Sequence, residues 1–265
     1  MVAFVDKDPQ KRGLFIEGIP VIRPEEICNY EYETLYISTV RYYDEICYEL
    51  RMLGIDMNHV ELLEFSSNKY GGELAFWKNR FRNENNDFKN DHYKQLFLEI
   101  ADEQNDDFMT HKIVADFGCG PRGSLAWTDK PLIKIGIDVL INSYMKHFGN
   151  CMIKHGMIYV NCDERIIPLP SGCCDIMSTI NSLDHVENLN RMIEEIARVM
   201  KSGGIFWGGI NLNEPATLEE PQTLTESFLT KELSKYFSII KKEMAPEWFC
   251  IENSEKLWIK AVRLG

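Results

Sequence analysis

Two aspartates and a glycine-rich turn form the most chemically suggestive pattern in this chain. Asp116 closes an apolar run, and Gly118, Gly120 and Gly123 follow at once. Glycine allows positive φ and brings backbone N–H groups close to a ligand. Asp138 closes a second apolar run farther along the chain. A glycine turn with an acid about 20 residues later is how a βαβ unit binds an adenosine ribose. The pattern therefore predicts a nucleoside cofactor.

The residues within this turn distinguish between two nucleoside cofactors. The three glycines also fit the G-x-G-x-x-G spacing of dinucleotide-binding proteins, so an NAD-dependent oxidoreductase is one alternative. The Asp116 carboxylate, however, would repel a pyrophosphate and attract an ammonium group. Pro121 and Arg122 also interrupt the entry into a helix N-terminus that a pyrophosphate uses. S-adenosylmethionine carries an amino group and a sulfonium but no phosphate, so it is the expected cofactor.

Four blocks follow one another in the order of a known family. They are an acidic strand end with its glycine loop, a second strand-end acid, a third acidic block and a turn into a later strand, at residues 116–120, 137–138, 162–177 and 200–206. Together they resemble class I S-adenosylmethionine-dependent methyltransferases. Residues 181–186, Asn-Ser-Leu-Asp-His-Val, are similar to a bacterial small-molecule branch. The resemblance implies an α/β, Rossmann-like fold: a seven-stranded sheet with helices on both faces.

The resemblance also implies which residues contact the cofactor. Asp116 would meet the amino group of the methionine part, and Asp138 would take both ribose hydroxyls. Asp163 would meet the adenine amino group, with Cys162 and Glu164 as alternatives for that contact. The other expected cofactor contacts lie in the same loops and after the fourth strand: Gly118, Cys119, Gly120, Val139 and Asn181.

His185 is the expected catalytic base. Transfer from a sulfonium mainly requires alignment and exclusion of water, but a neutral hydroxyl acceptor must also lose a proton. Histidine titrates near neutrality. Asp184 would orient it, or would serve only as an acid at the start of the next helix, and His185 itself would otherwise cap that helix. Asn211 and Glu214 are expected acceptor contacts. No metal is expected, since the eight cysteines contain no C-x-x-C and the six histidines are scattered.

Hydrophobic patterning predicts the elements that position these residues. Alternation and apolar runs favour strands in a core domain over 112–265, at 112–117, 133–138, 157–161, 174–181, 204–211, 236–243 and 255–262. An apolar stripe over 189–200 predicts an amphipathic helix that ends at Gly203.

Two segments precede this core. Residues 1–60 are predicted to form a small α/β lobe with one parallel sheet, because strand, helix and strand alternate there. The lobe resembles part of a Rossmann-like domain found on glycan-biosynthesis enzymes, but its glycine turn is missing, so docking or homodimer formation is its expected role. Residues 61–111 are predicted to be a helical cap that walls the acceptor pocket. Tyr70, placed in a glycine loop, and the aromatic run around Trp77 are the candidates for that wall.

Charge and composition narrow the function further. The net charge of −12 argues against nucleic-acid partners, which select for basic patches. No apolar run approaches the ~20 residues of a membrane span, and a signal peptide's apolar core is missing, so a cytoplasmic protein is expected. The expected function is methylation of a small polar metabolite, such as a sugar or a phosphorylated precursor of a surface glycan. A non-catalytic scaffold that binds the cofactor is the second alternative.

Overall fold

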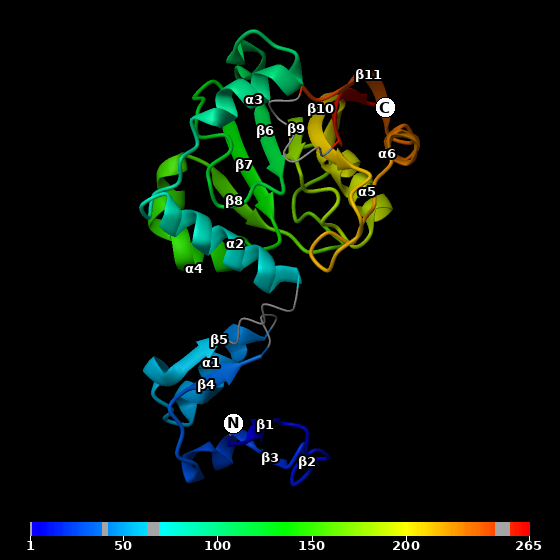
Figure 1. Cartoon of the computed structure of the whole chain (residues 1–265). Helices are drawn as coiled ribbons and strands as arrows, with labels where there is room; N and C mark the ends of the chain where they lie inside the picture. The colour runs from blue at the N-terminus through cyan, green and yellow to red at the C-terminus, as the bar shows by residue number, and fades with distance from the viewer. Residues whose placement is uncertain (1, 39–41, 63–68, 247–254) are drawn as a thin grey trace. The chain divides into compact units, whose positions relative to one another are not determined.

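The computed structural model describes residues 2–38, 42–62, 69–246 and 255–265 (Figure 1). It divides into two compact units, Met1–Ser66 and Ser67–Gly265. Each unit buries a hydrophobic cluster of its own, so each is described separately.

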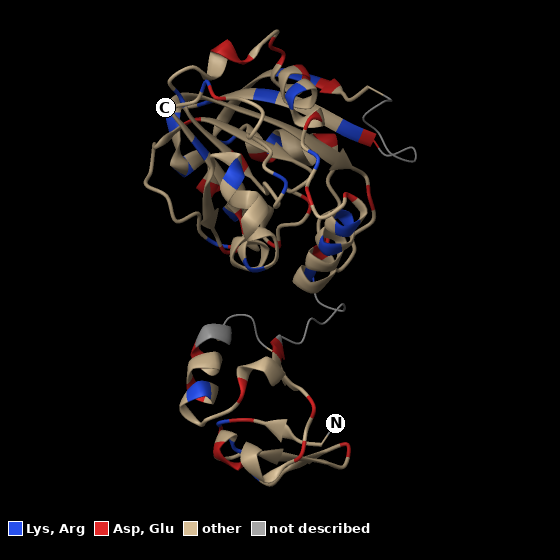
Figure 2. Ribbon diagram, turned by 90° about the vertical axis from the view of Figure 1, so that its left-hand side faces the viewer, with Lys and Arg blue, Asp and Glu red and all other residues tan. Residues whose placement is uncertain are grey.

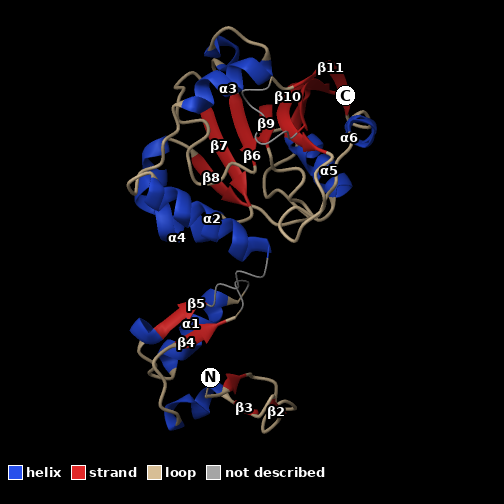
Figure 3. Ribbon diagram, viewed as in Figure 1, coloured by secondary structure: helices blue, strands red, loops and turns tan. Residues whose placement is uncertain are grey.

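A seven-stranded sheet forms the centre of the second unit (Figures 1 and 3). Its strands run in the order β11 (Phe237–Met244), β12 (Glu255–Arg263), β10 (Met200–Leu212), β9 (Cys174–Ile180), β6 (Ile113–Phe117), β7 (Ile133–Asp138) and β8 (Ile158–Asn161). β12 is antiparallel to both of its neighbours, whereas the pairs from β10 to β8 are parallel. The strand order reverses between β6 and β9. Ligands of such sheets bind at that point, outside the carboxyl ends of the strands.

The seven predicted core strands are all present, and the predicted fold class is confirmed. One boundary was wrong: β10 begins at Met200, directly after helix α5 (Leu189–Val199). Met200 pairs with Cys174, and the pairing shifts register between Met200 and Ile205. The expected turn at Gly203 is thus an irregularity within the strand. Gly203 has φ +75°, which glycine adopts without strain.

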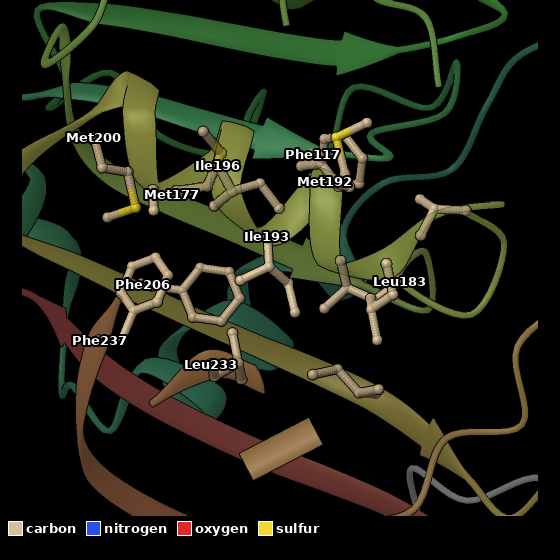
Figure 4. Packing of buried hydrophobic residues seen from close by; sticks show 14 of the residues in the cluster. Phe117, Met177, Leu183, Met192, Ile193, Ile196, Met200, Phe206, Leu233 and Phe237 are labelled. Atoms are coloured by element: carbon tan, nitrogen blue, oxygen red, sulfur yellow. The ribbon is translucent and has the colours of Figure 1, made fainter. Parts of the chain in front are cut away.

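Helices cover both faces of the sheet (Figure 3). α5 and α6 (Glu226–Leu233) pack into the largest hydrophobic cluster, while α3 (His92–Ala101) packs against β10 and β12 in another. In the largest cluster, Ile193 of α5 lies close to Phe206 and Leu233 (Figure 4). The rings of Phe206 and Phe237 are 5.2 Å apart. Burying this apolar stripe fixes α5 on the sheet and holds the loop before it at the carboxyl edge.

Two helices lie at the other end of the sheet. α2 (Lys69–Asn83) packs against α4 (Ile141–Met152), which follows β7 and precedes the short helix η4 (Ile153–His155). α2 contains Tyr70, so the prediction that this tyrosine lies in a glycine loop was wrong. Gly71 and Gly72 belong to the same helix, and a Cβ built on Gly72 would lie 2.6 Å from Glu219 Oε1. Between α3 and β6 lies the short helix η3 (Asp106–Met109).

The first unit contains two small sheets, where the sequence predicted one. β1 (Phe4–Val5), β3 (Ile19–Ile22) and β2 (Phe15–Ile16) form the first, and β4 (Leu35–Ile37) and β5 (Val60–Leu62) form the second. β3 pairs with β1 on one side and with β2 on the other, so it has no free edge for β4. The β2–β3 hairpin turns at Glu17 and Gly18, both with positive φ, as in a tight hairpin turn. The connecting helices are η1 (Pro24–Asn29), α1 (Tyr43–Met52) and η2 (Met57–His59).

Candidate functional site

The loop after β6 is held close to the end of β7. The amides of Gly118 and Cys119 both donate to the carbonyl of Ile137, at 2.8 and 3.2 Å. Gly118 has φ +71°, and a Cβ built there would lie 2.2 Å from Cβ of Ser182. The position therefore excludes any side chain on two independent grounds, conformation and space. The turn therefore packs closely against the loop after β9 at the switch point of the sheet.

Asp138 fixes this loop from the end of β7. Its Oδ2 accepts a hydrogen bond from the Gly120 amide at 3.0 Å, and its Oδ1 accepts one from the Leu140 amide at 2.9 Å. A carboxylate has about four acceptor positions, so each oxygen keeps capacity for one ribose hydroxyl. Burial raises the pKa of Asp138 to about 6, against the opposing effect of the two amides.

Asp116 lies at the same edge and is buried. Its carboxylate accepts hydrogen bonds from Ser124 Oγ at 2.5 Å and from Ser178 Oγ at 2.6 Å. Burial raises the pKa of Asp116 to about 6, and the nearby Asp138 adds to the rise, while the two serines oppose it. The structure thus brings the two aspartates of the sequence pattern together as a pair that a cation would stabilise.

This pair predicts a pH dependence of cofactor binding. The expected ammonium group beside Asp116 would favour its ionised form, so binding would lower a pKa that is about 6 in the free protein. Affinity for S-adenosylhomocysteine should therefore be full above about pH 6 and should fall on acidification, by about tenfold per unit for one such group. Calorimetry between about pH 5 and pH 7 measures this. Asp116→Asn should make affinity depend less steeply on pH, since only the titration of Asp138 would remain. An unchanged pH dependence in that variant would exclude Asp116 from the ammonium contact.

The loop after β8 contains the third predicted acidic block. Asp163 is exposed, and its Oδ1 accepts from the amides of Arg165 and Ile166, at 2.7 and 2.8 Å. Cys162 is buried, and its amide donates to the Asp138 carbonyl at 3.1 Å. The loop is therefore joined to the end of β7 by its backbone. Val139 packs against the cluster that contains Cys162, whereas Cys119 belongs to the cluster of α4. Burial raises the pKa of the Cys119 thiol well above its usual range, which keeps that thiol protonated and unreactive.

Glu164 connects α2 to two loops of the carboxyl edge. Its Oε1 accepts from Tyr70 Oη at 2.9 Å and from Lys69 Nζ at 2.5 Å, and its Oε2 accepts from the Glu187 amide at 3.2 Å. Glu164 was a candidate for the adenine contact and Tyr70 for the acceptor contact. The structure joins the two to each other, so α2 is anchored over this edge of the sheet.

Trp77 of α2 lies over the glycine loop. A Cβ built on Gly120 would come within 2.8 Å of Trp77 Cζ2. Trp77 Nε1 donates to Glu73 Oε1 at 2.6 Å, one helical turn earlier. Glu73 was missed by the sequence analysis, although its spacing of four from Trp77 was the available signal. Its charge acts on the pKa of Asp138, so it lies near the expected ribose site.

The loop after β9 and the end of β10 bring three buried oxygen acceptors to the rim. Asn211 Nδ2 donates to Asp184 Oδ2 at 3.1 Å, and both residues are buried. Asn181 has φ +47°, and its amide donates to the Gly209 carbonyl at 2.9 Å. Asn181 Oδ1, Asp184 Oδ1 and Asn211 Oδ1 are buried and accept no hydrogen bond within the described chain. Buried acceptors without donors are costly, so this rim is built for a ligand that supplies donors or positive charge.

His185 faces a glutamate that the sequence analysis did not include. Its Nε2 lies 3.4 Å from Oε1 of Glu220, whereas Asp184, its expected orienting partner, is hydrogen-bonded to Asn211. Glu220 lies in the long connection between β10 and α6, and no spacing rule links it to His185. Asp184, His185 and Glu220 nevertheless place one ligand-type atom each within 4.8 Å of one another. Glu214 is half-buried nearby, and its charge acts on Asp184.

The strand order, the antiparallel β12 and the glycine loop at the switch point define the class I methyltransferase variant of the Rossmann-like fold. Residues 115–208 match a methyltransferase domain family, and residues 1–61 match the family described as C2185-like, N-terminal. No curated protein matches the chain. The second unit thus has the class I methyltransferase fold, and its match to a methyltransferase domain family supports S-adenosylmethionine as its cofactor.

Solved structures share this fold at low identity. A SAM-dependent methyltransferase from Aquifex aeolicus is 15% identical, with a TM-score of 0.53 over 73% of this chain and 98% of that one. A putative methyltransferase from Haloferax volcanii, solved with the Trm112 methyltransferase activator, is 13% identical, with a TM-score of 0.54 over 74% and 96%. The [4+2]-cyclase SpnF is 17% identical, with a TM-score of 0.53 over 66% and 81%.

Other surface properties agree with the composition. No helix among the described residues is both long and apolar enough to cross a membrane. Basic residues are interspersed with acidic ones along the ribbon of the second unit (Figure 2).

Proposed function

We propose that this protein transfers the methyl group of S-adenosylmethionine to a hydroxyl of a small polar acceptor at the rim formed after β9 and β10. The observation that carries this proposal is the set of three buried, unpaired oxygens of Asn181, Asp184 and Asn211. Asn181 and Asp184 follow β9, and Asn211 is the penultimate residue of β10, two strands whose carboxyl ends border the expected cofactor crevice. His185 also lies close enough to Asp138 for its charge to affect the pKa of that carboxyl. An acceptor at this rim would therefore lie beside the methyl donor.

The acceptor class follows from the chemistry of this rim. Unpaired carbonyl and carboxylate oxygens bind hydroxyl donors, so a sugar or another polyhydroxylated precursor of a surface glycan fits it best. Without a bound cation, a phosphoryl group would face the carboxylates of Asp184, Glu214 and Glu220 and would be repelled. Of the acceptors that the sequence suggested, we therefore favour a sugar hydroxyl over a phosphorylated position. The glycan context rests on the resemblance of the N-terminal lobe.

The proposal also assigns roles to α2 and to the N-terminal lobe. α2 would serve as the cap, since Trp77 covers Gly120 and Tyr70 is joined to Glu164. The lobe of residues 1–60 would serve docking or homodimer formation, in line with Leu14, Phe15 and Ile16, which are about half exposed or more. The described cysteines are all free, which suits a reducing cytoplasm.

A labelled-methyl assay tests the proposal. The full chain is incubated with methyl-labelled S-adenosylmethionine and two acceptor sets, free sugars and the same sugars carrying phosphate. We expect label in the sugar set together with S-adenosylhomocysteine. Cofactor binding without transfer to either set, or to a cell metabolite extract, would favour a non-catalytic scaffold. An outcome without methyl transfer is worth testing for, because one solved structure with this fold is named as a [4+2]-cyclase and not as a methyltransferase.

His185→Ala should lower kcat by about 100-fold or more, because a positioned group that assists proton loss contributes on this scale. Affinity for S-adenosylhomocysteine should change little. His147→Ala is the matched control, since His147 is exposed on α4, away from the β9 and β10 loops. Equal turnover in the His185 variant and in wild type would remove His185 from the reaction.

A further inference from the structure

We infer that Asp184, His185 and Glu220 bind a divalent metal cation at the rim of the site. The three residues come from two separate segments: the loop after β9 and the connection between β10 and α6. One imidazole nitrogen and two carboxylate oxygens lie within 4.8 Å of one another. These are ligand types that hold first-row divalent ions such as Mn²⁺.

The strongest reason for a cation is the environment of Asp184. Its side chain is 3% exposed, and its Oδ1 accepts no hydrogen bond from the described residues. Its Oδ2 accepts one hydrogen bond, from the neutral amide of Asn211 at 3.1 Å. Within the part of the chain that the structure describes, no lysine or arginine forms an ion pair with it. A buried carboxylate is costly unless it is paired or ligates a metal. The charge of His185 acts on Asp184, but that imidazole is itself placed to bind the ion.

The separation of the other two ligand atoms also suits an ion. His185 Nε2 and Glu220 Oε1 are 3.4 Å apart, and no hydrogen bond is formed between them. Neighbouring ligands of an octahedral ion at about 2.1–2.4 Å are about 3.0–3.4 Å apart. Both side chains are partly open to solvent, at 27% and 31% exposure, so an ion has a route to the buried Asp184.

Asn211 supports the site through a hydrogen bond to one of the proposed ligands. Metal-ligating carboxylates are usually hydrogen-bonded in turn, which fixes their orientation. The Asn211 amide orients Asp184 in this way, and the unpaired Oδ1 of Asn211 remains for a metal-bound water or an acceptor hydroxyl. With three protein ligands, an octahedral ion keeps about three open positions.

The role of the ion rests on the proposed function, whereas its binding does not. A cation at this position would bind the acceptor hydroxyl and lower its pKa, so that the proton leaves to solvent. The oxygen lone pair would then form the new C–O bond, and the C–S bond would break with its electron pair passing to sulfur, which yields neutral S-adenosylhomocysteine. His185 would act as a ligand in this scheme, and its loss would still lower turnover.

Direct titration tests the site. The full chain is treated with chelator, exchanged into metal-free buffer and titrated with MnCl₂, with the electron paramagnetic resonance signal of free Mn²⁺ as the readout. We expect one saturable site per chain. Glu220→Gln should weaken the affinity at least tenfold, since it removes a ligand from a half-exposed segment without leaving a buried gap. Asp184→Asn should do so as well, and circular dichroism reports whether that buried variant is folded.

Glu219→Gln is the matched control, because it removes the same charge one residue earlier. It should keep the wild-type affinity. Absence of saturable binding in wild type, or equal weakening in the Glu219 and Glu220 variants, would overturn the proposed site. Calorimetry with S-adenosylhomocysteine separates the two proposals: cofactor binding without Mn²⁺ binding refutes the cation alone, and Mn²⁺ binding with no methyl transfer to any acceptor refutes the proposed function alone.

Discussion

Asp138→Ala should weaken binding of S-adenosylhomocysteine by about 100-fold or more, because hydrogen bonds to an ionised group contribute about 1.5–3 kcal/mol each. Two effects combine in this variant. The ribose hydroxyls lose their expected acceptor, and the Gly120 and Leu140 amides lose Oδ2 and Oδ1. The glycine loop then loses the contact that holds it in its binding shape. Isothermal titration calorimetry measures the loss directly.

Asp175→Ala provides the control for this experiment. Asp175 also accepts a backbone amide, that of Ile113 at 2.8 Å, and it pairs with Lys201 at 2.7 Å. It lies near the start of β9, at the opposite edge of the sheet from the crevice. Its loss should lower stability and leave cofactor affinity near wild type. Equal affinity in the Asp138 variant and in wild type would place the cofactor away from the end of β7.

Gly118→Ala should destabilise the fold by about 2–5 kcal/mol and abolish cofactor binding. A left-handed backbone costs a non-glycine residue about 1–2 kcal/mol, and overpacking costs about 1–3 kcal/mol more. The second contribution is specific to this position, where the new Cβ would lie 2.2 Å from Cβ and 2.5 Å from Oγ of Ser182. Ser182 cannot yield freely, because its Oγ donates to the Phe117 carbonyl at 3.0 Å. Denaturant unfolding gives the free-energy change.

Two further variants separate strain from crowding. Gly172 has φ +63° with no atom within 4 Å of its built Cβ, so Gly172→Ala should show the conformational cost alone. Combining Gly118→Ala with Ser182→Gly should recover part of the lost stability, since it removes the atoms that the new methyl group meets. If the double variant lost more unfolding free energy than the sum of the two single losses, the two loops would not be in the contact that the structure shows.

The sequence was sufficient for the seven-stranded fold of the second unit and for placing two acids at strand ends beside the glycine turn. Asp116 and Asp138 each end an apolar run, and parallel strands bring such ends to one edge. The apolar stripe on α5 predicted which face of this helix is buried, because its spacing matches the helical period. These features depend on local order along the chain, which a single sequence contains.

The contacts between distant segments could not be predicted in this way. Glu220 and His185 lie 3.4 Å apart although α5, β10 and part of a long connection separate them in sequence. Tyr70 beside two glycines suggested a loop, because glycine disfavours helices, yet tertiary contacts to Glu164 hold it in α2. The division of the N-terminal sheet likewise depends on β2, a strand of two residues that occupies the edge β4 would need.

The position of Trp77 over Gly120 has a consequence for kinetics. A nucleoside bound along the glycine loop would lie beside Trp77, and α2 would have to shift for each molecule that arrives or leaves. Such gating slows association below the usual range for open sites and often makes product departure the slow step of a cycle. The Lys69–Glu164 ion pair, which fastens the start of the same helix, would then govern how long spent cofactor stays bound.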